Sequence, residues 1–133
     1  MLYIHTKGVR YNPNDNKEND WIDYMLYFLV EQSKLCISIL NNNYDTVGCN
    51  YSNDLDKECF KYTHPFPPPH YNGNFWWANT NYVRTLPLLS EENQDRNAPE
   101  FWLFKNNPTL YNLHSSQVSH FSYTYPRNKY CVN

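Results

Sequence analysis

One amphipathic stretch, set between two short β-like runs, constrains the fold of this chain more than any other feature. Apolar residues recur at helical spacing through positions 22–40, with charged and polar residues between them. Asp20 is a suitable N-cap for a helix that begins at Trp21, and the asparagine triplet at 41–43 is expected to end it. The sequence therefore predicts a long surface helix over 21–40.

Shorter elements surround this helix. Alternating or apolar runs predict strands at 2–5, 44–50, 74–78 and, as an edge strand, 119–125. Asn79 or Thr80 can cap a helical turn that Pro87 ends, and Pro99 suits the first turn of another helix. Strands that alternate with helices in a chain of 133 residues predict a single domain, 1–133, with a short mixed sheet and flanking helices, an α/β fold.

Charge and hydropathy exclude several classes of function. The net charge is −2 and no basic run is present, which argues against a nucleic-acid partner. No apolar run reaches the roughly 18 residues that a membrane span requires. The first residues lack the charged and apolar regions of a signal peptide, so an intracellular location is expected.

Three segments carry a resemblance to a known family. They read YIHTKG at 3–8 with Asp20-Trp21 beyond, YDTVG at 44–48, and HYNGNFWWA at 70–78. In this order they resemble glycosyltransferase-like proteins of bacterial polysaccharide clusters and large DNA viruses. That family is similar to the GT-A class, a Rossmann-like α/β sandwich that binds a nucleotide sugar. The resemblance implies transfer of a sugar from a nucleotide-sugar donor to a glycan acceptor.

The chain departs from the family pattern in three ways. Ile22 stands where an arginine commonly follows the tryptophan. The acidic metal-binding motif of GT-A enzymes is not evident, so an Mn²⁺ or Mg²⁺ requirement is left open. The chain also begins near the middle of the family pattern, so we expect a partial GT-A sandwich, its C-terminal part, and a second chain that supplies the N-terminal half.

The resemblance and the chemistry of glycosyl transfer together suggest residues for the leaving diphosphate. His5 and Lys7 project to the same side of an extended strand end and can neutralise phosphate charge without a metal. Arg96 is expected to pair with phosphate or with Glu100, and His120 matches the late histidine that GT-A enzymes often place on the metal or phosphate. The alternative for each histidine is a structural hydrogen bond.

Four residues of the third segment are candidates for binding the sugar, and one glutamate is a candidate base. Gly73 would let the backbone approach a sugar, Asn72 or Asn74 could bond its hydroxyls, and Trp76 could cover its ring. The alternative is that the aromatic residues here belong to the core, since neighbouring strand residues face opposite ways. Glu100 is the candidate general base; its alternative role is in helix capping.

A second function class stays open beside the transferase. Without the N-terminal half, the chain would expose strand edges that need a partner or a cover. The alternative is therefore a non-catalytic half-domain that completes a partner chain or binds glycan through its aromatic residues.

Overall fold

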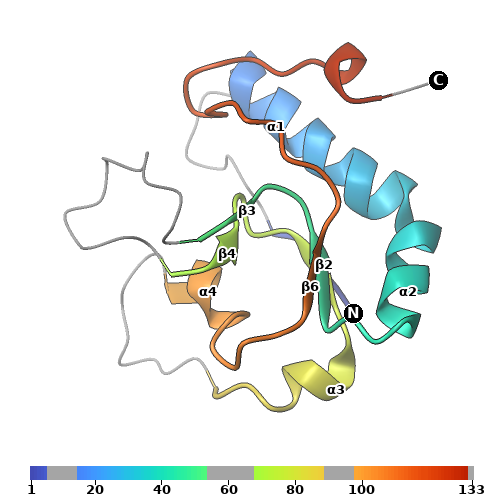
Figure 1. Cartoon of the computed structure of the whole chain (residues 1–133). Helices are drawn as coiled ribbons and strands as arrows, with labels where there is room; N and C mark the ends of the chain where they lie inside the picture. Colours follow the sequence, from blue (N-terminus) through green and yellow to red (C-terminus); the bar gives the residue numbers. More distant parts are fainter. Residues whose placement is uncertain (6–14, 54–67, 89–97, 132–133) are drawn as a thin grey trace.

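The computed structural model describes residues 1–5, 15–53, 68–88 and 98–131 (Figure 1). Its main sheet has the strand order β1-β5-β2-β6. β1 (Leu2–Tyr3) pairs antiparallel with β5 (Trp76–Ala78), which pairs antiparallel with β2 (Thr46–Gly48). β6 (Leu110–Asn112) joins parallel to β2, and β3 (Tyr51–Ser52) with β4 (His70–Tyr71) forms a separate antiparallel pair. The predicted α/β class with a short mixed sheet is confirmed.

The helical stretch begins five residues earlier than the sequence predicted. α1 spans Asn16–Leu26, and its N-cap is Asp15, whose carboxylate accepts hydrogen bonds from the N–H groups of Lys17 and Glu18. Asp20, the predicted cap, lies inside the helix and instead accepts a hydrogen bond of 3.0 Å from the N–H of Tyr125. Asp15 and Asp20 both lie shortly before the residues that recur at helical spacing, and the helix begins after the earlier of the two.

A π turn divides the predicted helix in two. Residues Tyr27–Glu31 form the π turn, and α2 follows over Ser33–Asn41. Two side chains donate to carbonyl oxygens within this turn: the indole N–H of Trp77 bonds the oxygen of Leu29 at 2.7 Å, and the Cys36 thiol bonds that of Phe28 at 3.4 Å. These bonds tie the turn to the sheet and to α2, and so help satisfy carbonyls in an irregular part of the helix.

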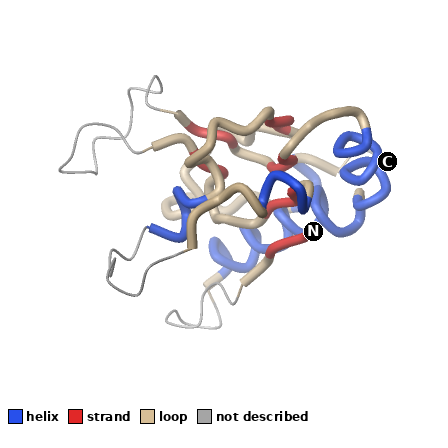
Figure 2. The backbone as a smooth tube through the Cα atoms, turned by 90° about the horizontal axis from the view of Figure 1, so that it is seen from below, coloured by secondary structure: helices blue, strands red, loops and turns tan. Residues whose placement is uncertain are grey.

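Helices cover both faces of the main sheet (Figure 1). Leu2, Val47 and Trp77 face α1 and α2, where they meet a core around Trp21, Tyr24, Met25, Leu29 and Cys36. Tyr3, Trp76 and Ala78 face the other way, toward α3 (Thr80–Val83), capped by Asn79, and α4 (Ala98–Trp102). The alternation along β5 therefore follows the pleat of the strand. Figure 2, which views the molecule from below, shows the helices (blue) beside the short strands (red).

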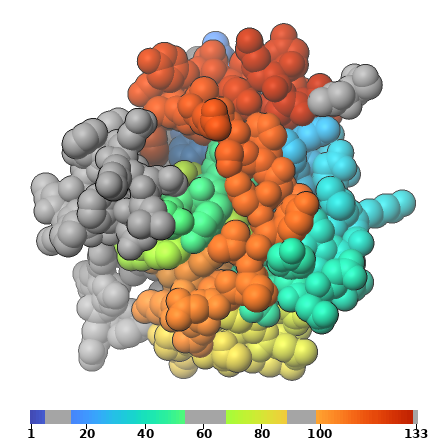
Figure 3. All heavy atoms as spheres, in the orientation of Figure 1, coloured from blue at the N-terminus to red at the C-terminus, as the bar shows by residue number. Residues whose placement is uncertain are grey.

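The last described residues do not form the predicted edge strand. The N–H groups of Ser122 and Tyr123 both bond the carbonyl oxygen of Ser119, which makes a turn within 119–125. The strand that does form is β6, which the sequence did not predict; it finds its partner in β2. After β6 the chain crosses α1 and makes a 3₁₀ turn, Arg127–Lys129, at the top of the view (Figure 1). The atoms of this C-terminal segment form the upper edge of the space-filling view (Figure 3).

No helix among the described residues is long and apolar enough to cross a membrane.

Candidate functional site

The two most specific sequence segments meet at the end of β1. His5 follows β1 and Gly73 lies in the turn between β4 and β5, 68 positions along the chain. The Nε2–H of His5 donates to the carbonyl oxygen of Gly73 at 3.0 Å, and the imidazole edge packs on Phe75 with 5.1 Å between ring centroids. The strand pairing of β1 with β5 brings these residues together, since Tyr3 is opposite Trp76.

The turn itself is held against helix α1. Gly73 has a φ of +92°, a conformation that favours glycine, and it is buried. A Cβ at this position would lie 2.5 Å from the sulfur of Met25 and 3.2 Å from the ring of Trp21. The absence of a side chain at Gly73 therefore permits a close approach to α1; its approach to a sugar stays a prediction.

The two asparagines of the turn have different environments. Asn72 is exposed, its N–H donates to the carbonyl oxygen of Asn50 at 3.1 Å, and its Oδ1 lies 2.9 Å from His70 Nε2. Asn74 is buried; its Oδ1 accepts from the indole N–H of Trp76 at 3.0 Å, and its Nδ2 donates to the carbonyl oxygen of Pro99 at 3.5 Å. Asn72 is therefore exposed to a ligand although its Oδ1 also contacts His70, whereas the amide of Asn74 is buried and used within the protein.

Trp76 belongs to the core, which is the alternative that the sequence analysis gave for the aromatic residues of this run. Its side chain is only 3% exposed and stacks on Tyr3 with 4.9 Å between centroids. The indole N–H already has its acceptor in Asn74. Trp77 is half-buried on the opposite face, and Phe75 is buried. The aromatic run supplies packing on both faces of β5.

Helix α4 brings Glu100 to the same side of the molecule. The bond from Asn74 to Pro99 joins the turn to α4, and Phe101 packs its ring edge-on against His70 at 5.2 Å. Glu100 is half-buried in the first turn of α4. Lys7 and Arg96, the predicted phosphate-binding cations, lie outside the described residues.

His120 lies beside a residue that the sequence did not single out for a site. Its Nε2 lies 2.8 Å from the Ser116 hydroxyl and 3.3 Å from Nδ2 of Asn50, and its ring stacks on Trp21 with 5.4 Å between centroids. In the sequence, Asn50 is the last residue of the strand predicted at 44–50 and the first of a glycosylation sequon, Asn50-Tyr51-Ser52. The asparagine is 6% exposed and its amide nitrogen is engaged, so the folded chain offers no free acceptor for a glycan there.

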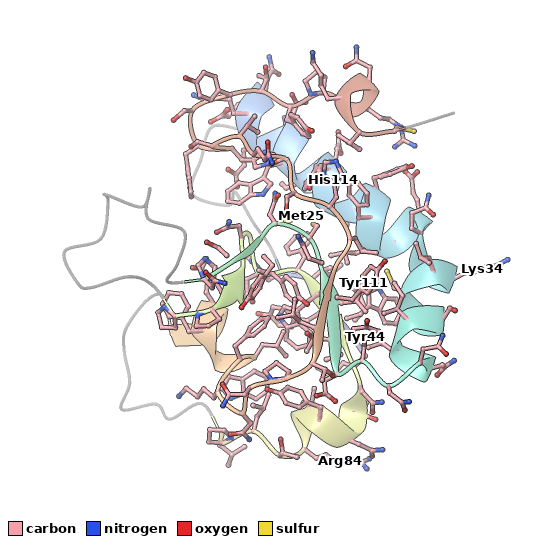
Figure 4. All side chains as sticks on the ribbon, in the orientation of Figure 1. Met25, Lys34, Tyr44, Arg84, Tyr111 and His114 are labelled. Carbon is pink, nitrogen blue, oxygen red and sulfur yellow. The ribbon has the colours of Figure 1, made fainter. Side chains whose placement is uncertain are left out.

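Burial favours the neutral forms of His120, His114 and Tyr24. It lowers the pKa of His120 to about 4, although the carboxylate of Asp20 acts in the opposite direction. Burial also lowers the pKa of His114, whose Nδ1 lies 2.7 Å from the Tyr24 hydroxyl where the C-terminal segment crosses α1 (Figure 4). It raises the pKa of Tyr24 well above its usual range. The two imidazoles therefore act here as neutral hydrogen-bonding groups.

These contacts define one connected region, which we call the turn site. It consists of His5, the turn 72–74, Asn50 and His120, linked through the Asn72–Asn50 and Asn50–His120 hydrogen bonds. Sequence reasoning identified His5, the turn and His120 but missed Asn50. No group of three or more His, Cys, Asp or Glu that could hold a metal ion occurs within the described ranges.

No protein-family model matches this chain, and neither does any curated protein sequence or solved structure.

Proposed function

We propose that this chain is a glycosyltransferase-like protein whose turn site takes part in binding a nucleotide sugar. The observation that carries the proposal is the 3.0 Å hydrogen bond between His5 and Gly73, which joins the two segments that most resemble that family. If the similarity of the two segments to that family were accidental, nothing would require them to be in contact, since His5 and Gly73 are 68 positions apart.

Exposed polar groups at the turn site suit such a ligand. Asn72 is exposed and carries both donors and an acceptor, which is what sugar hydroxyls require. His5 is half-buried at the end of β1, and its imidazole is anchored through Nε2. In this proposal its other ring nitrogen, Nδ1, accepts a hydrogen bond from the ligand. In this proposal Lys7 and Arg96 supply positive charge to the diphosphate, and Glu100 serves as the base toward a glycan acceptor.

Ligand-observed NMR on the chain with UDP-, GDP- and dTDP-sugars, with and without Mn²⁺, tests the proposal. We expect saturable binding of one donor, weakened about tenfold or more in His5→Ala, Asn72→Ala and Lys7→Ala, because each change removes a contact to the ligand. Lys34→Ala and Arg84→Ala are matched controls, since both side chains are exposed and extend away from the turn site (Figure 4). A folded chain that binds none of these donors would exclude the proposal.

The sheet edge favours a second candidate, a non-catalytic module that completes a partner chain. β1 lies at one end of the strand order, next to the turn site, and its only strand neighbour among the described residues is β5. A free edge can accept a further strand from another protein. Met1 exchanges hydrogen bonds with Ala78, so the N–H groups of Leu2 and Ile4 are the ones that face the free edge. Binding of a partner strand would protect these two N–H groups from hydrogen exchange, whereas binding of a nucleotide sugar would not.

A further inference from the structure

Asn50 connects three separate segments by hydrogen bonds. Its N–H donates to the carbonyl oxygen of His114 at 2.8 Å, its carbonyl oxygen accepts from the N–H of Asn72, and its Oδ1 accepts from the N–H of Ser116 at 2.8 Å. Its φ of +52° is left-handed, a conformation that asparagine adopts more readily than most residues. The backbone and the side chain of Asn50 are thus both engaged at the turn site.

The orientation of the Asn50 amide determines which nitrogen of His120 carries hydrogen. A backbone N–H can only donate, so the side-chain atom 2.8 Å from the nitrogen of Ser116 is the amide oxygen. The other side-chain atom, Nδ2, is then a donor, and it lies 3.3 Å from Nε2 of His120. Nε2 must accept this bond, and the Ser116 hydroxyl at 2.8 Å donates to it as well. A neutral imidazole that accepts at Nε2 carries its hydrogen on Nδ1.

The Nδ1–H group of His120 is a buried donor without a hydrogen-bond partner among the described residues. The side chain is 5% exposed, and the rings of Trp21, Tyr24 and Tyr125 pack around it. Buried polar groups in native proteins are nearly always paired, so an unpaired donor indicates a bound water or a ligand atom.

We infer that Asn50 is a positioning residue that holds His120 as its Nδ1–H tautomer, so that this N–H can donate to an acceptor oxygen of the bound ligand. The ligand part of the inference rests on the proposed function, in which the acceptor is a phosphate or a sugar oxygen of the nucleotide sugar. The tautomer follows from the hydrogen bonds of Asn50 and is tested without any ligand.

NMR of the chain with ¹⁵N-labelled histidine reads the tautomer directly. At pH 7 we expect Nδ1 of His120 to show the shift of a protonated nitrogen and Nε2 that of a bare one; His120→Gln assigns the signals by their loss. Asn50→Asp keeps an oxygen for Ser116 but presents a second oxygen to Nε2, so Nε2 should become protonated. The control Asn112→Asp keeps its bond of 3.2 Å from the N–H of Tyr51 and should leave the His120 signals unchanged. A protonated Nε2 in the wild type, or unchanged signals in Asn50→Asp, would overturn the inference.

The ligand part is tested with the same variants, once circular dichroism shows that they are folded. We expect Asn50→Asp to bind the nucleotide sugar about tenfold more weakly than the wild type and Asn112→Asp to bind it unchanged. A shift of the His120 Nδ1 signal with UDP, GDP or dTDP alone would assign the acceptor to phosphate, and a shift with the sugar conjugates only would assign it to the sugar.

Two outcomes separate failure of this inference from failure of the proposed function. Equal binding by the wild type and by Asn50→Asp, with the tautomer switched, would overturn the positioning role and leave the proposed function standing. If the wild type binds no nucleotide sugar, the proposed function fails, and the ligand role of His120 fails with it even where the tautomer behaves as inferred.

Discussion

Acidification should destabilise this protein through His120 before its carboxylates become protonated. Burial lowers the pKa of His120 from its ordinary value of 6.5 to about 4 in the folded chain. The unfolded state therefore binds more protons between these values, and stability falls as the pH falls through that window. The full difference corresponds to about 3 kcal/mol, of which roughly 2 kcal/mol is expressed between pH 7 and pH 5.

Urea unfolding at pH 7, 6 and 5 measures this loss, with His120→Gln as the comparison, because glutamine offers an oxygen to the Asn50 amide but does not titrate. We expect the wild type to lose about 2 kcal/mol more than the variant over this range. The His114 pKa is lowered by burial as well, so both proteins should retain a smaller loss from that residue. Equal pH dependence in the two proteins would refute the reasoning, since it would mean that His120 does not need to discharge on folding.

Three further substitutions test the packing. Gly48→Ala would place a Cβ 2.5 Å from the ring of the buried Tyr71, so we expect a destabilisation of roughly 1–3 kcal/mol in urea unfolding; an unchanged midpoint would show that the ring can move away. Trp77→Phe removes the donor to the Leu29 carbonyl in the π turn and should cost about 1–3 kcal/mol, with faster hydrogen exchange in that turn; unchanged exchange would contradict the role given to this bond. Arg127→Ala breaks an ion pair whose two side chains are about half exposed, and we expect no measurable change in the thermal midpoint.

Local signals predicted several elements correctly. The strand around Thr46 and Val47 forms as β2, and Asn79 caps the turn of helix α3 by accepting from the N–H of Asn81 at 3.0 Å. The cap depends on residues close in sequence, whereas β2 was marked by its β-branched residues and is completed by the distant strands β5 and β6. The start of α1 was misplaced because Asp15 and Asp20 are both suitable caps, and the tertiary bond from Tyr125 to Asp20 is not a local signal.

Elements that depend on distant partners were harder to predict. β6 is three residues long and is defined by its register against β2, with Thr46 opposite Leu110. The run 119–125 alternates as a strand would, but the described chain supplies no pairing partner and the backbone turns at Ser119 instead. Along β5, alternation predicted that Trp76 and Trp77 face opposite ways, but not which face each would take, because helices cover both faces of the sheet.

The candidate site was predictable where a motif marks a residue and not where a residue acts through hydrogen bonds alone. His5 and Gly73 stood out by their segments, and the structure brings them into contact. Asn50 follows a strand in a sequence rich in asparagine, and its left-handed backbone and four-way bonding arise only when the chain is folded.

The turn site and the core share residues, and this decides which substitutions can report on function. Gly73 lies against Met25, and Trp76 and Asn74 are buried and bonded to each other, so changes at these positions would disturb folding whether or not a ligand binds nearby. Asn72 is different: its side chain is exposed, and its tie to Asn50 is made by its backbone N–H, which Asn72→Ala retains. The substitution removes one contact within the protein, the 2.9 Å contact of Oδ1 with Nε2 of His70, so its stability must be measured beside its binding. Loss of nucleotide-sugar binding in Asn72→Ala at unchanged stability would therefore identify a ligand contact, which the same loss in Gly73→Ala would not.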